Sequence, residues 1–132
     1  MKKAQNYFQS KGETLYLLKS KEAEQYMRDA ANTDYVSCYR KIGSEGLFQT
    51  LVECSKQQQL GFEIETLLEF DTDEFLKGKT AFIGVISVND DQEKDFVAFM
   101  LNRNLGITLL GHVTKGEFRV DGKSYGFVQD YA

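Results

Sequence analysis

The stretch Gly43-Ser44-Glu45-Gly46, followed by Leu47 to Ile64 (LFQTLVECSKQQQLGFEI), decides the fold that we expect for this chain. A turn of small residues precedes a segment in which Leu47, Leu51 and Cys54 recur at helical spacing. Such a stripe is typical of an amphipathic helix with one buried side. The segment therefore predicts a helix that packs one side onto the rest of the domain.

The ends of this helix follow from its flanking residues. Ser44 is expected to be the N-cap, with Glu45 in the first turn, where an acidic side chain faces the positive end of the helix dipole. The polar run Gln57-Gln58-Gln59 ends the helix, and Gly61 leads into a strand. We thus predict a helix over residues 44–59 and a strand directly after it.

Further elements are predicted on both sides of this unit. Asn89-Asp90-Asp91 opens a second main helix over residues 92–103, whose apolar stripe contains Phe96, Phe99 and Met100. A minor helix is predicted over residues 22–31. Short apolar or alternating runs predict strands over residues 14–18, 35–39, 62–68, 80–88, 107–113, 117–120 and 123–128. The uncharged run 80–88 is expected to be a central strand.

The order of these elements predicts an α+β fold. We expect a two-layer sandwich, in which a mixed β-sheet carries the two main helices on one face and ends in a C-terminal β-hairpin turning at Asp121-Gly122. A length of 132 residues fits one domain. We expect a flexible lead-in over residues 1–11 and a single domain over residues 12–132.

Composition excludes several classes of protein. The net charge is -4 and the Lys and Arg residues are scattered, which argues against binding to nucleic acid. The apolar run 81–88 is too short to cross a membrane, and no signal peptide is visible, so a cytoplasmic protein is expected. Cys38 and Cys54 fit no metal-binding spacing. Cys54 lies on the apolar stripe of the predicted helix and is predicted to be a buried reduced thiol, with a disulfide to Cys38 as an open alternative.

A weak ligand site is predicted at Gly43, Ser44, Glu45 and Gly46. Free amides at the start of a helix point toward an anion, so this turn could bind the phosphate of a small molecule. The turn lacks the Gly-Lys-Ser/Thr ending of a P-loop. A purely structural glycine turn with a Ser cap is the alternative.

His112 is the only histidine, and with Thr114 it marks a possible cleft. A backbone-bonded strand histidine is the alternative interpretation, because catalysis would need a partner group within hydrogen-bonding reach. The acidic run Asp71, Asp73 and Glu74 lacks the glycine and the distal acid of a calcium loop and is predicted to be a solvated loop. No catalytic residue, metal site or cofactor is predicted.

Three segments together resemble the C-terminal domain of the aminoimidazole ribonucleotide synthetase superfamily, within which formylglycinamide ribonucleotide amidotransferase (phosphoribosylformylglycinamidine synthase) is the most similar member. They are an opening strand, a glycine-rich turn with its helix and strand, and an ending of the form IGxVTxG…VDG. In this chain they are Gly12–Leu18, Ile42–Ile64 and Leu110–Gly122. The resemblance spans roughly residues 12–125.

The resemblance implies a domain that works with another one. Enzymes of this superfamily have an N-terminal domain that forms a dimeric barrel and binds ATP and metal, with the chemistry in the cleft between the two domains. Their glycine-rich turn reads His-Asp-x-Ser-Asp/Glu-Gly-Gly, whereas this chain has no His-Asp pair and has Leu47 in place of the second glycine. We therefore expect no independent catalysis.

Three hypotheses follow. The first is a stand-alone accessory domain that binds a partner, a second copy of itself or a phosphorylated small molecule. The second is a subunit of a split ATP-dependent synthetase of purine biosynthesis, completed by a separate ATP-binding chain and forming an amidine. The third, least favoured, is a self-sufficient enzyme that uses His112 and the acidic loop.

Overall fold

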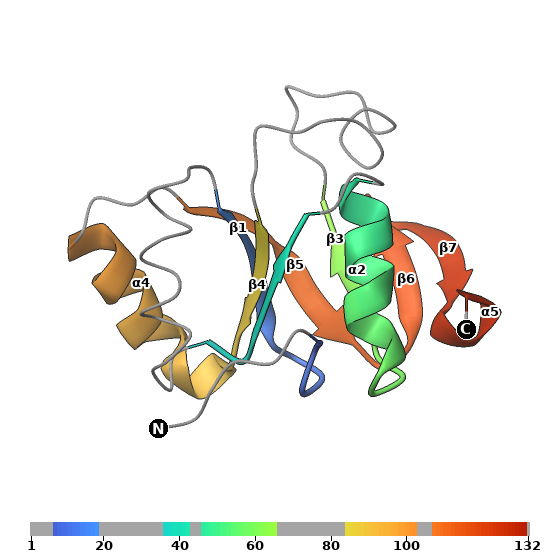
Figure 1. The fold of residues 1–132 in the computed structure, drawn as a ribbon, viewed down its shortest axis with the longest axis horizontal. Helices are drawn as coiled ribbons and strands as arrows, with labels where there is room; N and C mark the ends of the chain where they lie inside the picture. Colours follow the sequence, from blue (N-terminus) through green and yellow to red (C-terminus); the bar gives the residue numbers. More distant parts are fainter. Residues whose placement is uncertain (1–6, 19–35, 43–45, 66–83, 103–106, 132) are drawn as a thin grey trace.

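The computed structural model describes residues 7–18, 36–42, 46–65, 84–102 and 107–131. These residues form a seven-stranded sheet in the order β2-β4-β1-β5-β3-β6-β7 (Figure 1). The strands are β1 Thr14–Leu18, β2 Cys38–Lys41, β3 Gly61–Ile64, β4 Gly84–Val88, β5 Ile107–Thr114, β6 Glu117–Val120 and β7 Lys123–Phe127. The fold is therefore α+β, as predicted.

The sheet is mixed because one of its neighbouring pairs is parallel. Strands β3 and β6 run parallel, with Phe62 opposite Phe118, and the other five pairs are antiparallel. Strands β6 and β7 form the predicted C-terminal hairpin, in which Asp121 and Gly122 both have positive φ angles (53° and 81°). Positive φ at both central residues is the signature of the two-residue hairpin turn.

The helices of the described segments are α2 Leu47–Lys56, the 3-10 turn η1 Asp90–Gln92, α4 Glu93–Asn102 and α5 Val128–Tyr131. Helix α4 starts where the Asn89-Asp90-Asp91 turn predicts, and the Asn89 side chain accepts a hydrogen bond from the Asp91 amide at 2.9 Å. Helix α2 is shorter than the predicted 44–59 span. Helix α5 is a single turn that follows β7. It begins at Val128, which the sequence predicted to be the last residue of the final strand.

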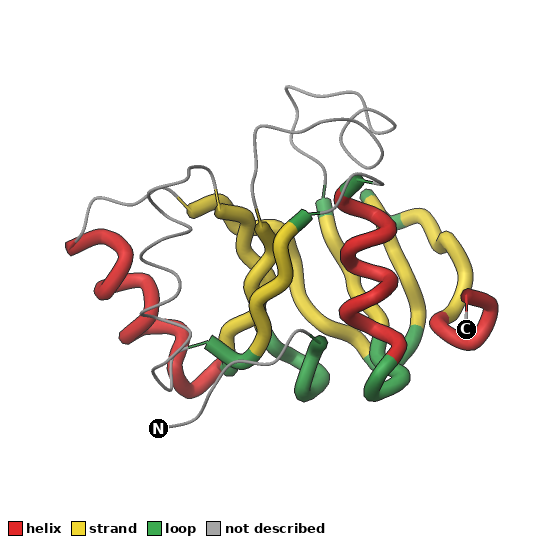
Figure 2. The backbone as a smooth tube through the Cα atoms, in the orientation of Figure 1, coloured by secondary structure: helices red, strands yellow, loops and turns green. Residues whose placement is uncertain are grey.

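The two main helices lie on opposite faces of the sheet, not on the one face that the sequence predicted (Figure 2). In β1, Leu15 and Leu17 belong to the core beneath α2, whereas Tyr16 belongs to the core beneath α4. Side chains of a strand alternate between the two faces of a sheet, so the two cores are on opposite sides. The described residues thus form helix, sheet and helix layers, with α4 over the β2-β4-β1 end.

The strands next to β3 approach it unusually closely. A Cβ atom on Gly111 of β5 would lie 2.0 Å from the Glu63 carbonyl oxygen, and one on Gly61 would lie 2.3 Å from the Glu117 carbonyl oxygen. No side chain fits at either position without moving backbone. The two glycines therefore allow β5 and β6 to flank β3 at this spacing.

Residues ahead of β1 also contribute to the core. Phe8 is fully buried, and its amide donates a hydrogen bond to the Cys54 carbonyl at 2.9 Å. Phe8, within the predicted lead-in, is thus packed against α2. None of the described helices is long and apolar enough to span a membrane.

Several predictions fall outside the described residues. They concern the minor helix over residues 22–31, the acidic run Asp71, Asp73 and Glu74, the end of the 62–68 strand and the first part of the 80–88 strand. The described part of that strand, Gly84–Val88, is buried along its whole length. It has a neighbour on each side, β2 and β1, so it is an interior strand, although it lies next to one edge of the sheet.

Candidate functional site

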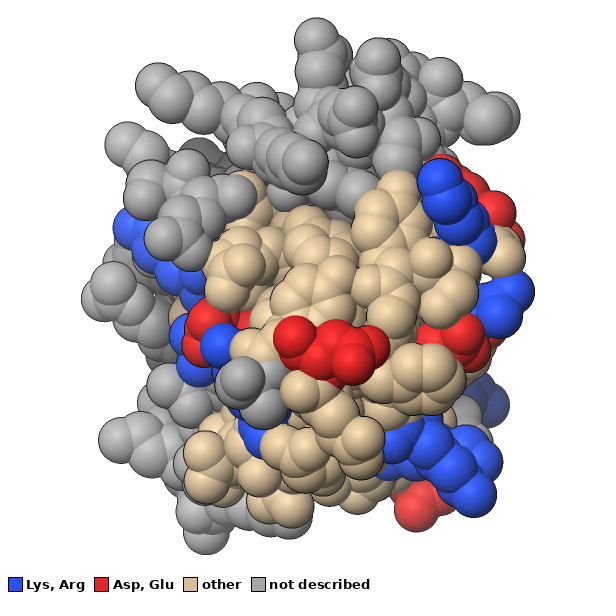
Figure 3. All heavy atoms as spheres, turned by 90° about the vertical axis from the view of Figure 1, so that its right-hand side faces the viewer, with Lys and Arg blue, Asp and Glu red and all other residues tan. Residues whose placement is uncertain are grey.

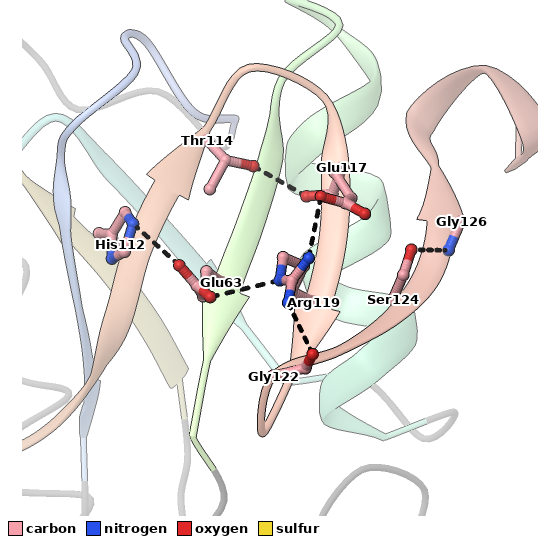
Figure 4. A network of polar contacts seen from close by, with 8 residues as sticks. All are labelled: Glu63, His112, Thr114, Glu117, Arg119, Gly122, Ser124 and Gly126. Atoms are coloured by element: carbon pink, nitrogen blue, oxygen red, sulfur yellow. Dashed lines mark hydrogen bonds and ion pairs between the residues drawn. The ribbon is translucent and has the colours of Figure 1, made fainter.

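A row of charged side chains crosses three neighbouring strands on the sheet face opposite α2 (Figure 4). Glu63 of β3 lies opposite His112 of β5 and beside Arg119 of β6. The His112 Nε2 atom is 3.5 Å from one Glu63 carboxylate oxygen, and the Arg119 Nε atom is 3.4 Å from the other. Arg119 Nη1 is in turn 3.5 Å from Glu117 Oε1. We call His112, Glu63, Arg119 and Glu117 the charge row.

Strand alternation places the charge row where it is. On β3, Phe62 and Ile64 are buried on the α2 side, so Glu63 between them points to the other face. On β6, Phe118 and Val120 are buried in the same way, so Arg119 between them shares the face of Glu63. The Phe62 and Phe118 rings stack with centroids 4.6 Å apart, which holds the two strands in this register.

The charge row is exposed and its contacts are weak. About half of the His112 side chain (52%) and over a third of those of Glu63 (39%) and Arg119 (38%) are exposed. Pairs with this exposure contribute about 0–1 kcal/mol each, because water screens them. The histidine contact is an ion pair only when the imidazole is protonated. The arrangement is suited to recognising a polar surface or ligand by hydrogen bonds.

Of the two predicted cleft residues, the structure brings only Thr114 to a pocket. His112 and Thr114 are two residues apart on β5 and share a face. The Thr114 hydroxyl donates a hydrogen bond to the Glu117 carbonyl at 2.8 Å, and Thr114 lines an open pocket of about 340 Å³. His112 does not line that pocket and instead contacts Glu63. The two residues therefore belong to different surface features.

The predicted phosphate turn is described only at its last residue. Gly43, Ser44 and Glu45 lie outside the described residues, whereas Gly46 is buried and is the N-cap of α2, with a φ angle of 98°. The prediction that Ser44 caps the helix is wrong, as is the placement of Glu45 in its first turn. A glycine occupies the cap because a side chain is strained at this positive φ. The Gly46 carbonyl accepts hydrogen bonds from the Thr50 amide and hydroxyl, at 3.3 and 2.9 Å.

Sequence reasoning missed the partners of His112. The alternation in Phe62-Glu63-Ile64 and Phe118-Arg119-Val120 was readable and places one charged residue of each strand on an open face. What could not be read was that β3 lies between β5 and β6. That order alone brings the two segments to His112.

A second polar cluster is buried beneath α2. The Glu13 side chain is 2% exposed, and its Oε1 atom accepts hydrogen bonds from the Ser87 hydroxyl and the Gln9 amide, both at 3.1 Å. Its Oε2 atom has no partner among the described residues. Cys38 and Cys54 are both free and buried, which confirms the prediction for Cys54. The hydrogen bond with Cys54, followed by burial, raises the pKa of the Cys38 thiol.

The described residues gather no group of three His, Cys, Asp or Glu side chains that could hold a metal ion. Helix α2 carries a further exposed ion pair, in which Lys56 lies 3.2 Å from Glu53. The hydrogen bond from Lys56 lowers the pKa of Glu53. The charge row links four residues, whereas this pair links two.

Comparison with families of known proteins identifies the class to which this fold and surface belong. Residues 4–123 match the family described as AIR synthase related protein, C-terminal domain. This match covers most of the chain, and the chain belongs to that family. It confirms the resemblance to this family seen in the sequence.

Solved structures show the same fold at low sequence identity. T. maritima PurL in complex with ATP superposes with a TM-score of 0.77 at 11% identity, covering 96% of this chain and 26% of that one. The protein tt0281 from Thermus thermophilus has a TM-score of 0.68 at 17% identity, covering 91% and 52%. Thiamine-monophosphate kinase from Stenotrophomonas maltophilia has a TM-score of 0.67 at 12% identity, covering 92% and 54%. Among curated proteins, no match is found.

The present chain thus spans about a quarter of the PurL chain and about half of the other two. Each of these proteins contains a domain of this fold together with a comparable or larger amount of further chain. The fold is therefore used as one part of a larger protein in all three.

Proposed function

We propose that this chain is a binding or accessory module that works beside an ATP-binding unit and has no catalysis of its own. The observation that carries this proposal is the family match over residues 4–123, which is to a C-terminal domain. The similar structures extend well beyond the shared fold, and one of them, PurL, was solved with ATP. A module of this kind contributes a surface on which a partner or a substrate is positioned.

The charge row provides a surface that suits this role. Its acidic and basic groups alternate across β5, β3 and β6, and they are already oriented by contacts with one another (Figure 4). Pre-oriented polar groups at an interface give specificity and register more than affinity. We expect a cytoplasmic partner chain to lie over this part of the sheet.

The test is reconstitution with an ATP-binding synthetase chain from the same organism. We expect the two chains to co-purify and the Glu63→Lys variant to weaken the complex, because it reverses the central charge of the row. Asp91→Lys makes the same change of charge away from the row, in the turn before α4, and should leave the complex intact. Absence of a complex, or equal binding by both variants, would contradict the proposal.

The alternative is that the chain is a required subunit of a split ATP-dependent synthetase of purine biosynthesis. The same structural likeness to PurL supports it. The measurement that separates the two roles is ATP-dependent amidine formation by the partner, with and without this chain. A large gain in rate on mixing favours the subunit, and tight binding without a gain in rate favours the accessory module.

We also propose that the Gly43–Gly46 turn binds the phosphate of a small molecule weakly. The support is the family's glycine-rich turn and the position of Gly46 at the start of α2. Titration with inorganic phosphate should show weaker binding to Ser44→Ala and Gly43→Val than to the wild type. Equal binding by all three would leave a structural turn only, and sedimentation of the same samples would reveal any homo-oligomer.

A further inference from the structure

A pocket lies where three turns of the chain meet at one end of the sheet. The turns are the α2–β3 turn, the β5–β6 turn and the junction of β7 with α5. The pocket has a volume of about 340 Å³ and is open to solvent. Its lining residues are Gln59, Thr114, Lys115, Gly116, Glu117, Phe127, Val128 and Gln129. This volume is at the lower end of the range for small-molecule sites.

Hydrogen bonds between and within the turns hold the walls of the pocket. The Val128 amide donates to the Gly116 carbonyl at 2.8 Å, which ties α5 to the β5–β6 turn. The Phe127 amide donates to Asp130 Oδ2 at 2.9 Å, and the Tyr131 hydroxyl donates to the Tyr125 carbonyl at 2.7 Å. The last turn of the chain is therefore held in one position beside the pocket.

Some of the groups that line this pocket are available to contact a ligand. Phe127 is 53% exposed, and its ring stacks on no other ring of the described residues. Lys115 is exposed and pairs with no acidic group in the described segments. Glu117, the acidic residue of the lining, is paired with Arg119 at 3.5 Å, so its charge is partly offset.

Two side-chain amides also line the pocket. Gln59 donates its Nε2 group to the Lys56 carbonyl at 2.9 Å, which leaves its amide oxygen as an acceptor. Gln129 is exposed and adds a second amide to the lining. A flat aromatic surface, one cation and two amides are the groups that recognise a planar ring with an attached anion. On the side of β7 and α5, most of the described surface is formed by uncharged residues, and acidic and basic groups are scattered among them (Figure 3).

We propose that this pocket binds a nucleoside monophosphate or a compound of that class. The heteroaromatic ring stacks on Phe127, the phosphate contacts Lys115, and the amides of Gln59 and Gln129 bond to the edge of the ring. Aromatic side chains bind bases in this way with little dependence on sequence. The volume fits one nucleotide and not a dinucleotide. This site shares only Glu117 with the charge row, and it does not depend on the proposed partner.

The test is calorimetric titration of the whole chain with AMP, adenosine and ribose 5-phosphate at low salt. We expect AMP to bind with a Kd of about 1 mM or tighter. Phe127→Ala should weaken the binding of AMP and of adenosine at least about fivefold, because it removes the stacking surface. Lys115→Ala should weaken the binding of AMP and of ribose 5-phosphate by a similar factor, and it should leave the affinity for adenosine unchanged.

Leu109→Ala serves as the matched control, because Leu109 is an exposed apolar residue (63%) of β5 that does not line the pocket. It should bind AMP like the wild type, and urea unfolding should show that all three variants are folded. The proposal is overturned if AMP does not bind at about 10 mM, or if inorganic phosphate alone binds as well as AMP. It is also overturned if Phe127→Ala alters self-association in sedimentation while AMP binding stays the same.

Discussion

One face of the sheet is built differently at its two ends. At the β2-β4-β1 end, Tyr16, Ile86 and Val88 are buried beneath Phe96 and Met100 of α4. At the β5-β3-β6-β7 end, the same face carries the charge row (Figures 1 and 4). We call these the covered half and the open half. The opposite face is apolar along both halves, under the core that contains α2.

The difference follows from the pattern of each strand. Strand β4 is buried at all five positions, and β1 has apolar residues on both faces, which is typical of strands covered on two sides. Strand β6 alternates between half-buried and buried residues, as a strand with one solvated face does. The comparison teaches that α4 determines which half of the sheet is available for binding.

The largest expected effect on stability comes from truncating a buried side chain in the covered half. Phe96 is fully buried, whereas Leu101, also on α4, is 69% exposed. Phe96→Ala should lower the free energy of unfolding by about 3–5 kcal/mol, because it leaves a cavity under α4. Leu101→Ala should change it by less than about 0.5 kcal/mol. Urea unfolding measures both, and similar losses would contradict the separation of buried and exposed sides of α4.

A smaller but still large effect is expected at the boundary between β5 and β3. Gly111→Ala places a Cβ atom 2.0 Å from the Glu63 carbonyl oxygen, so backbone has to move. We expect a loss of about 1–3 kcal/mol or more, as for other overpacked sites. Gly116→Ala is the matched control, because its Cβ atom would have its nearest neighbours at 3.8 Å. Equal midpoints of urea unfolding for the two variants would show that β5 can shift freely.

The stability contributed by the covered half should also depend on pH in the alkaline range. The Tyr16 hydroxyl donates a hydrogen bond to Glu93 Oε1 at 2.6 Å, and burial together with that carboxylate raises the pKa of Tyr16 above its ordinary value of 10.0. The folded state thus favours the neutral phenol. Its contribution is fully present below pH 10.0 and is lost as the pH rises toward the folded pKa.

Tyr16→Phe tests this dependence. It should cost about 1–2 kcal/mol at neutral pH, where the hydrogen bond to a charged acceptor is intact. The gap between wild type and variant should narrow above pH 10.0. Chemical unfolding as a function of pH measures the gap, and a constant difference across this range would contradict the role of the hydroxyl.

The smallest effect is expected in the open half. A double-mutant cycle with Glu63→Gln and Arg119→Gln should give a coupling free energy of about 0.2–1 kcal/mol, because both groups are partly exposed. The coupling should decrease in high salt. A coupling above about 2 kcal/mol would mean that the row is shielded from water in solution. That result would indicate self-association over the open half, which sedimentation would detect.

The sequence predicted the local structure well because its signals come from neighbouring residues. The Asn89-Asp90-Asp91 turn located the start of α4, and Phe96 and Met100 were correctly placed on its buried side. Asp121-Gly122 located the hairpin. The start of α2 was wrong by a few residues, because a Ser and a Gly both suit a helix cap and only the backbone conformation at Gly46 distinguishes them.

The candidate site was predicted only in part. His112 and Thr114 were recognised as polar residues of one strand, but the pairing of His112 with Glu63 joins segments about fifty residues apart and depends on strand order. The same holds for the pocket, whose lining comes from three separate turns. No local pattern shows which turns will meet.

By itself, then, the sequence determined the fold class, the turns, the hairpin and the alternation that separates buried from solvated positions on each strand. These depend on backbone preferences and on side-chain spacing within a few residues. The tertiary structure alone decided the order of the strands, the placement of α2 and α4 on opposite faces, and the close approach at Gly111. Those features arise from contacts between distant segments, which are selected by packing of the whole core.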